Sequence, residues 1–177
     1  MRIYVDLDDT LVTSEIDPDT GFARRIFPRP GVFEFLSNLR THGPIRILTR
    51  AERSHADRAI RKLGPAAGFV KEMITREDLE PVEDRVEAIL EAPISTESKN
   101  VLMKEVGAIL PKGVIFDNED PYTDAYFVKT KAVGVGLGEW IQVEQFSLDL
   151  PDLGGLERAY AGFLERLPHL SMKGVHA

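Results

Sequence analysis

The amino-acid sequence predicts an α/β fold in which a parallel five-stranded sheet carries helices on both faces. Short apolar runs typical of buried strands alternate with amphipathic stretches typical of helices along most of the chain. Three of the runs end on a polar residue, namely Asp6, Thr49 and Asp117. Because parallel sheets bind ligands beyond the carboxyl ends of their strands, we expect these three side chains to share one edge of the sheet.

The local pattern justifies each element in turn. The run "RIYVD" at 2–6 is apolar and ends in an acid, and the stretch 12–28 sets an Asp-Thr-Gly turn between two β-prone arms, which predicts a small β-hairpin flap. Amphipathic segments that begin near proline or stop at glycine favour helices. The other predicted strands lie at 44–49, 69–74, 113–117 and 131–136, and the predicted helices at 28–43, 51–64, 76–91, 98–110 and 152–167.

The length of 177 residues and a hydrophobic content of 43% fit a single domain. We place this domain at 1–168, with the flap at about 12–28 and a frayed tail at 169–177. The passage between Thr49 and Lys99 holds only a helix, a strand and a second helix, so no large cap domain is expected. The carboxyl edge of the sheet should therefore be open.

Composition excludes several classes of protein. A net charge of −7 gives no overall basic field, so membrane binding is not expected and nucleic acid is expected only as a substrate. No apolar stretch is long enough to span a bilayer, and no signal sequence opens the chain, which predicts a cytoplasmic protein. The absence of cysteine excludes disulfides, thiolate catalysis and cysteine-bound metals. Any metal ligands must be oxygen or nitrogen atoms.

Two carboxylates, Asp6 and Asp8, follow the first strand at a spacing that makes them repel each other unless a cation or proton intervenes. Oxygen ligands of this kind suit Mg²⁺, and Asp117 can add a third carboxylate. A carboxylate nucleophile on phosphorus forms an aspartyl-phosphate, which divides hydrolysis into two easier steps. We therefore predict Asp6 as the nucleophile and Asp8 as the group that moves protons.

Other polar residues are candidates to hold the phosphoryl group or support the metal. Thr49 precedes a predicted helix, whose free amides bind anions, and Arg50 follows it. Lys99 stands at a predicted helix start, where a cation is unfavourable unless it faces an anion. Supporting contacts to the metal are expected from Thr10 and from the stretch 118–120, where Asn118 and Asp120 are favoured over Glu119.

These motifs together resemble the haloacid dehalogenase superfamily. "VDLDDTLV" resembles its first motif, and "IRILT", Lys99 and "VIFDNED" resemble the second, third and fourth in the same order. The resemblance implies a Rossmann-like fold and a magnesium-dependent phosphatase. It implies Asp6 as nucleophile, Asp8 as general acid and base, and Thr49 and Lys99 as phosphate contacts. Magnesium would then be held by Asp6, the backbone carbonyl of Asp8, and Asp117.

Within that superfamily the chain looks like the small phosphatases of the RNA polymerase carboxy-terminal domain. The stretches "RPGVFEFLSNL", "ILTRAE" and "FDNED" carry this resemblance. The chain departs from the group at Asp9, where glutamate is usual, and at Arg50, where a small residue is usual. Asp8 separates the chain from the dehalogenases of the superfamily, which lack an acid at this position.

Each assignment has a structural alternative. The acid pair could form a solvated turn, Thr49 could cap a helix, and Lys99 could be a surface lysine, with Lys104 as its nearest competitor. Arg24 and Arg25 could contact an anionic substrate, although exposed flap arginines without a role are the commoner case. None of the four scattered histidines is expected to bind a metal.

Competing functions also differ in what they require. A phospho-accepting receiver domain uses similar residues, but in another chain order, and a binding protein on a disabled phosphatase scaffold would not need every catalytic position filled. An open site suits a phosphoprotein, a nucleotide or a nucleic acid end. Oligomerisation, which the sequence does not predict either way, could instead cover the site and select a small metabolite.

Overall fold

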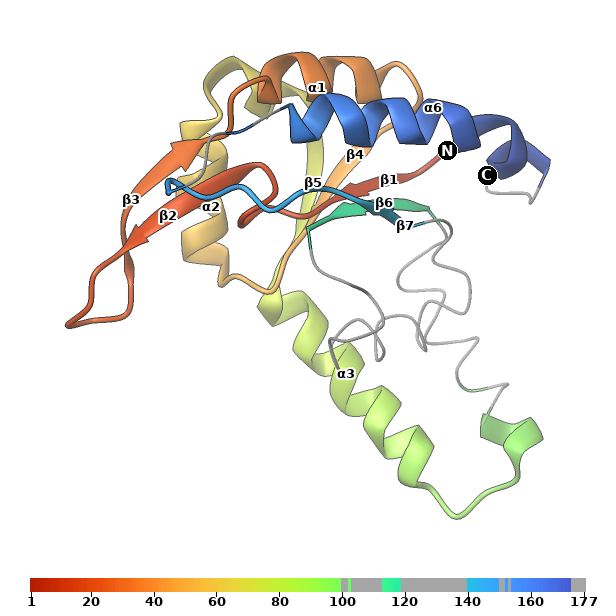
Figure 1. Ribbon diagram of the computed structural model, residues 1–177. Helices are drawn as coiled ribbons and strands as arrows, with labels where there is room; N and C mark the ends of the chain where they lie inside the picture. Colours follow the sequence, from red (N-terminus) through yellow and green to blue (C-terminus); the bar gives the residue numbers. More distant parts are fainter. Residues whose placement is uncertain (100–101, 103–112, 119–139, 150–151, 153, 173–177) are drawn as a thin grey trace.

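The computed structural model describes residues 1–99, 102, 113–118, 140–149, 152 and 154–172, and its centre is a parallel five-stranded sheet (Figure 1). The strand order is β5-β4-β1-β6-β7, and every neighbouring pair is parallel. This confirms the predicted sheet. Its strands are β1 (Ile3–Val5), β4 (Ile45–Leu48), β5 (Val70–Ile74), β6 (Val114–Asp117) and β7 (Trp140–Gln142).

The three residues of the central strand β1 are all fully buried, and the strand has a parallel neighbour on each side. Val5 pairs with Ile47 of β4 on one side and with Phe116 of β6 on the other. A strand that is covered on both faces reads as a continuous apolar run, as "IYV" does. The register brings the carboxyl ends of β1, β4 and β6 to the same edge, as predicted from the three polar strand ends.

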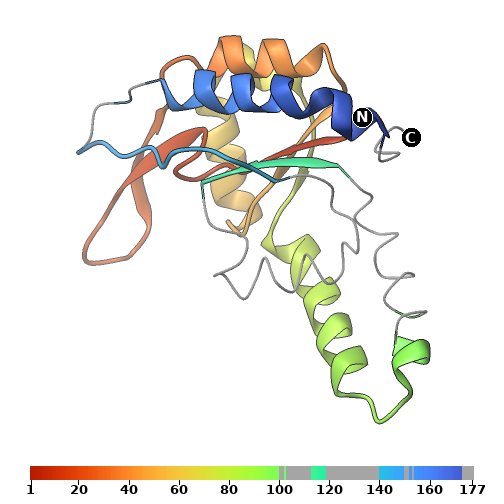
Figure 2. The same cartoon turned by 45° about the vertical axis from the view of Figure 1, so that its right-hand side comes forward.

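Helices cover both faces of the sheet. On one face α1 (Val32–Arg40) and α6 (Gly155–Met172) run side by side (Figures 1 and 2). Phe35 of α1 and Phe163 of α6 both pack edge-on against Phe116, with ring centroids 5.4 and 5.5 Å away. On the other face Leu79, near the start of α3 (Arg76–Glu91), joins a second apolar cluster with Tyr4. Beyond that contact α3 extends away from the sheet (Figure 1).

The predicted flap is an antiparallel hairpin of β2 (Val12–Ile16) and β3 (Ala23–Pro28), which projects from the sheet (Figure 1). Its turn is held by Asp17, whose Oδ1 accepts from the N–H groups of Asp19 and Thr20. Gly21 adopts φ 71°, a left-handed conformation that glycine takes without strain. The inner arm β3 lies along α2 (Arg53–Lys62), which is followed by the short 3-10 helix η1 (Gly64–Phe69).

Several predicted boundaries differ from the structure or lie outside the described residues. The last helix runs from Gly155 to Met172, not from 152 to 167, so the expected frayed tail from 169 is wrong at its start. The reason is that Leu170 is fully buried, and its packing carries the helix past Pro168. The fifth strand found is β7, whereas the predicted strand at 131–136 and most of the predicted helix at 98–110 lie outside the described residues.

Candidate active site

The carboxyl edge of the sheet brings Asp6, Thr49 and Asp117 together, as the sequence predicts. The ladder continues past the strands, because the Asp6 N–H donates to the carbonyl of Phe116 at 2.8 Å and the Thr49 N–H donates to the carbonyl of Ile74 at 3.0 Å. Asp117 and Thr49 are only 1% and 2% exposed. These backbone bonds fix the starting point of each functional side chain.

The turn that follows Asp6 is tight, and Asp9 is the residue that makes it possible. Its φ is 58°, a left-handed conformation that aspartate tolerates better than most residues. Its carboxylate accepts from the Thr13 hydroxyl at 3.2 Å and from the Gln145 side-chain amide at 3.0 Å. Asp9, one of the departures noted in the sequence, therefore ties the catalytic turn to the flap and to the segment after β7.

Thr10 and Asn118 connect the first and fourth motifs. The Thr10 side chain is fully buried, donates to Oδ1 of Asn118 at 2.9 Å and accepts from its N–H at 3.1 Å. This reciprocal pair holds the end of β6 against the turn after β1. Thr10 and Asn118 therefore lie next to the carboxylates, where they can support a metal site. Glu119 and Asp120 lie outside the described residues.

Electrostatics at Asp6 are unfavourable for its charged form. Burial raises the pKa of the Asp6 carboxyl well above its usual range, and repulsion from Asp117 and Asp8 raises it further. A hydrogen bond from the Leu7 N–H lowers the pKa, but by less than burial and the repulsion from Asp117 raise it. A buried carboxyl group with a raised pKa is stabilised either by binding a proton or by a nearby cation. Acids whose pKa is perturbed in this way are common at functional sites.

His55 is a site residue that the sequence analysis missed. Its Nε2 lies 2.8 Å from Oδ1 of Asp8, and the two side chains are 18% and 40% exposed. His55 stands in the first turn of α2, the helix that follows the strand leading to Thr49. The signal available in the sequence was this position, six residues after Thr49, where a first-turn side chain can reach the same edge of the sheet.

Around Thr49 the structure keeps one donor available. The Thr49 hydroxyl accepts a 3.1 Å bond from the Ala51 N–H, and its own proton can point toward the open edge. Thr49 does not cap α2, because the residue at that position is Glu52. Arg50 is exposed, and its carbonyl accepts from Nε of Arg76 at 2.9 Å.

Lys99 is not brought to this edge. It belongs to a helical segment that begins at residue 96, and the described part of this segment lies beyond the far end of α3, away from the sheet (Figure 1). The 16 residues of α3 span about 24 Å at 1.5 Å per residue. Its competitor Lys104 lies outside the described residues.

A buried ion pair stabilises the turn that follows β1. Arg29, 2% exposed, pairs with both carboxylate oxygens of Asp152 at 2.6 and 3.1 Å. The same guanidinium donates to the carbonyl of Thr10 at 3.2 Å and to that of Glu144 at 2.7 Å. Arg29 holds the pKa of Asp152 below its usual range. The pair therefore joins the catalytic turn to the segment before α6.

The donor set fits a magnesium ion with few protein ligands. Within the described ranges, no three side chains of histidine, cysteine, aspartate or glutamate form a ready metal cluster. The Asp6 and Asp117 carboxylates lie close enough together at this edge for Asp117 to raise the pKa of Asp6. Mg²⁺ commonly keeps several waters and binds one or two carboxylates together with substrate phosphate, so this sparse oxygen set suits it.

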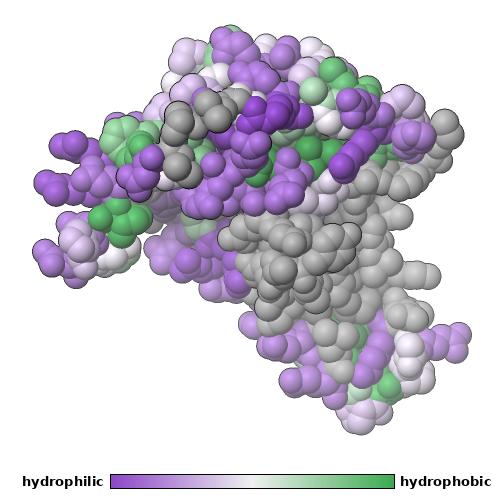
Figure 3. Space-filling model, viewed as in Figure 1, coloured by the Kyte–Doolittle hydropathy of each residue, from purple (hydrophilic) through white to green (hydrophobic). Residues whose placement is uncertain are grey.

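The site opens into a cavity of about 470 Å³ between the flap and α2. Asp8 and His55 form its inner end, and Arg76 lies on its wall. Ile16 and Phe22, 54% and 67% exposed, add apolar surface on the flap, which Figure 3 shows at the left of the molecule. In the described part of the chain, no separate domain covers this cavity.

A Rossmann-like sheet with paired acids at its carboxyl edge and no cap among the described elements defines a phosphatase of the haloacid dehalogenase type. Residues 2–124 match the model of the NLI interacting factor-like phosphatases, and the chain belongs to that family. No match was found among curated proteins. The match confirms the predicted family and a phosphatase function. None of the helices in the described ranges is long and apolar enough to cross a membrane.

Proposed function

We propose that the protein is a magnesium-dependent phosphomonoester hydrolase that works through an aspartyl-phosphate on Asp6. The observation that supports this most strongly is the electrostatic state of Asp6, a carboxyl crowded by Asp117 and Asp8 at the end of the central strand. Such repulsion is relieved when a divalent cation and a phosphoryl group occupy the edge. The family match supports the same class of reaction.

In the proposed mechanism the Asp6 carboxylate attacks phosphorus, and the bond to the leaving oxygen breaks. Asp8 donates a proton to that oxygen and then takes a proton from the water that hydrolyses the aspartyl-phosphate. The His55 contact at 2.8 Å holds the Asp8 carboxyl in place for both transfers. Thr49 donates its hydroxyl proton to a phosphoryl oxygen.

Magnesium would be held by the Asp6 and Asp117 carboxylates and by the backbone carbonyl of Asp8. When bound, it supplies positive charge that offsets the carboxylates and the negative charge on the phosphoryl group. The Thr10 and Asn118 pair keeps the two strand ends at a fixed separation, which a small ion with strict geometry requires.

We propose a phosphorylated protein segment as the substrate. The cavity is open, it is lined on the flap by the exposed apolar side chains of Ile16 and Phe22, and the described residues include no cap over it. An uncovered cavity admits a side chain that belongs to a larger chain.

The first experiment measures hydrolysis of a generic aryl phosphate with Mg²⁺ or with chelator, for the native chain, Asp6→Asn and Asp8→Asn. Metal-dependent turnover that both substitutions abolish is the expected result. Phosphopeptides, nucleotides, phosphorylated oligonucleotides and sugar phosphates are then compared. Strict preference of a monomer for one small metabolite would contradict the proposed substrate class.

A further inference from the structure

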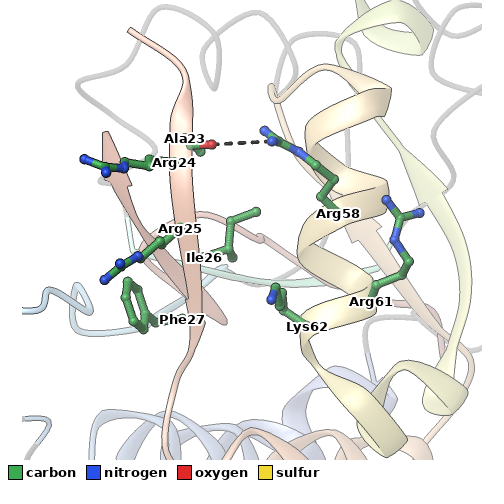
Figure 4. Close-up of a pocket in the computed structure, with 8 residues that line it drawn as sticks. All are labelled: Ala23, Arg24, Arg25, Ile26, Phe27, Arg58, Arg61 and Lys62. Carbon is green, nitrogen blue, oxygen red and sulfur yellow. Dashed lines mark hydrogen bonds between the residues drawn. The ribbon is translucent and has the colours of Figure 1, made fainter. Parts of the chain in front are cut away.

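A second cavity, of about 670 Å³, lies between β3 of the flap and α2 and is lined by five cationic side chains (Figure 4). We call it the cationic groove, and its cations are Arg24, Arg25, Arg58, Arg61 and Lys62. The chain as a whole carries a net charge of −7, so this concentration runs against its composition. A local field of this sign attracts anions.

Most of these cations are available to a ligand. Arg25 forms a long ion pair with Glu15, at 3.8 Å, and both side chains are exposed. Within the ranges that the structure describes, Arg24, Arg61 and Lys62 have no ion pair. Arg58 donates a 3.4 Å bond to the carbonyl of Ala23. Figure 4 shows Arg58 reaching toward β3 and Lys62 beside Ile26 in the gap between strand and helix.

The cationic groove adjoins the active-site cavity, because Ala23 and Arg58 line both. Arg58 stands one turn along α2 from His55, whose ring contacts Asp8. At 1.5 Å per residue, Arg58 and Lys62 lie about 4.5 and 10 Å further along the helix axis than His55. An extended peptide advances about 3.3 Å per residue, so it covers these distances in roughly one to three residues.

We propose that the cationic groove is a specificity subsite for an acidic group, a carboxylate or a second phosphate, about one to three residues from the phosphorylated residue of a peptide substrate. The inference rests on the proposed phosphatase function and adds that the enzyme recognises an acidic group near the phosphorylated residue. Arg58 and Lys62 are the principal contacts. Arg24, Arg25 and Arg61 raise the positive potential around them.

The observations favour a peptide over a nucleic acid. The cations occupy only two turns of α2 and one arm of the flap, which is room for one or two anionic groups and not a track for a polyanion. A strand of nucleic acid would also meet the repulsion of a chain with net charge −7. A peptide with one or two acidic residues meets the local field without that cost.

The test compares three otherwise identical phosphopeptides, with alanine, glutamate or phosphoserine three residues from the scissile phosphate. The native chain is compared with the double variant Arg58→Gln, Lys62→Gln, which removes both principal contacts, and with Lys71→Gln as a matched control on the edge strand β5. Each kcat/KM is divided by the same protein's turnover of a generic aryl phosphate, which corrects for any change at the catalytic centre.

We expect the native chain and the control to prefer the glutamate peptide about three- to ten-fold and the phosphoserine peptide more strongly, because exposed ion pairs contribute modestly and dianions more. The preference should lie in KM, weaken with added salt and fall to within twofold in the double variant. Equal kcat/KM for all three peptides, or a preference that survives in the double variant, would overturn the proposal.

A binding measurement separates this inference from the proposed function. Fluorescence anisotropy of the same labelled peptides on Asp6→Asn reports the groove without turnover, and Asp6→Asn with the double substitution is its control. If the peptides bind with a preference for the acidic ones but the native chain does not hydrolyse an aryl phosphate, the groove proposal is supported and the catalytic proposal is contradicted. Tighter binding of a phosphorylated oligonucleotide than of any peptide would assign the groove to nucleic acid and overturn the inference.

Discussion

Replacing Asp6 by asparagine should stabilise the metal-free protein while it abolishes catalysis. The substitution keeps the shape of the side chain and removes a charge that lies in buried surroundings beside Asp117 and Asp8. A charge without a compensating partner in such a place costs roughly 1–3 kcal/mol. Since 1 kcal/mol shifts the melting temperature of a chain of this size by about 2–4 °C, we expect a rise of about 3–10 °C.

The pH dependence of this effect has a definite sign. Because the pKa of Asp6 is raised in the folded protein, the folded state binds more protons than the unfolded state between the usual pKa of aspartate and the raised one. The penalty is therefore absent below that window and fully present above it. The difference in melting temperature between Asp6→Asn and the native chain should shrink as the pH falls through the window.

Thermal unfolding in chelator, followed by circular dichroism from alkaline to acidic pH, measures both quantities. Asp19→Asn is the matched control, because Asp19 is an exposed aspartate on the flap turn and does not contribute to the repulsion at Asp6. Addition of Mg²⁺ should raise the melting temperature of the native chain and not that of Asp6→Asn. If Asp6→Asn melts at or below the native temperature in chelator at alkaline pH, the argument from repulsion is refuted.

His55→Ala removes the 2.8 Å contact to Asp8 and should lower kcat about 10- to 100-fold with little change in melting temperature; an unchanged kcat and pH-rate profile would rule out a positioning role. Asp152→Asn leaves the buried Arg29 guanidinium without its partner and should cost about 3–5 kcal/mol in urea unfolding. Since the pKa of Asp152 is lowered, the native chain should lose that advantage as the pH falls through it, and equal stability at neutral pH would contradict the account. Lys99 lies beyond the far end of α3, so Lys99→Ala should leave kcat/KM for an aryl phosphate within about twofold of the native value, and a loss of about 100-fold would show that Lys99 contacts the phosphoryl group as the resemblance implies.

The sheet and the acids on its edge could be predicted because both depend on local pattern and on one rule of topology. Asp6, Thr49 and Asp117 each follow a run of buried apolar residues, and parallel strands place such ends together. The hairpin flap was predicted for a similar reason, since its turn chemistry lies within a few residues. In these cases the sequence near a residue determines where that residue lies.

Contacts between distant segments could not be predicted in this way. Asp9 and Gln145 are separated by 136 positions, and Arg29 and Asp152 by 123. Neither pair has a periodicity or spacing that a single sequence displays. His55 was missed for a related reason, because its contact with Asp8 depends on how the start of α2 is placed against the turn after β1.

The distant contacts explain how the fold tolerates an unfavourable catalytic edge. Crowded carboxylates would drive Asp6 away from Asp117, and a left-handed residue at Asp9 would otherwise be strained. The Arg29 pair holds the carbonyl of Thr10, and Asp9 is held from two other segments, so the turn between them has little freedom to relax. Repulsion that cannot be relieved by movement remains available to favour binding of a cation and a phosphoryl group. Substitutions that remove the contacts of Arg29 or of Asp9 should therefore lower the affinity for metal, even though neither residue is expected to touch the metal.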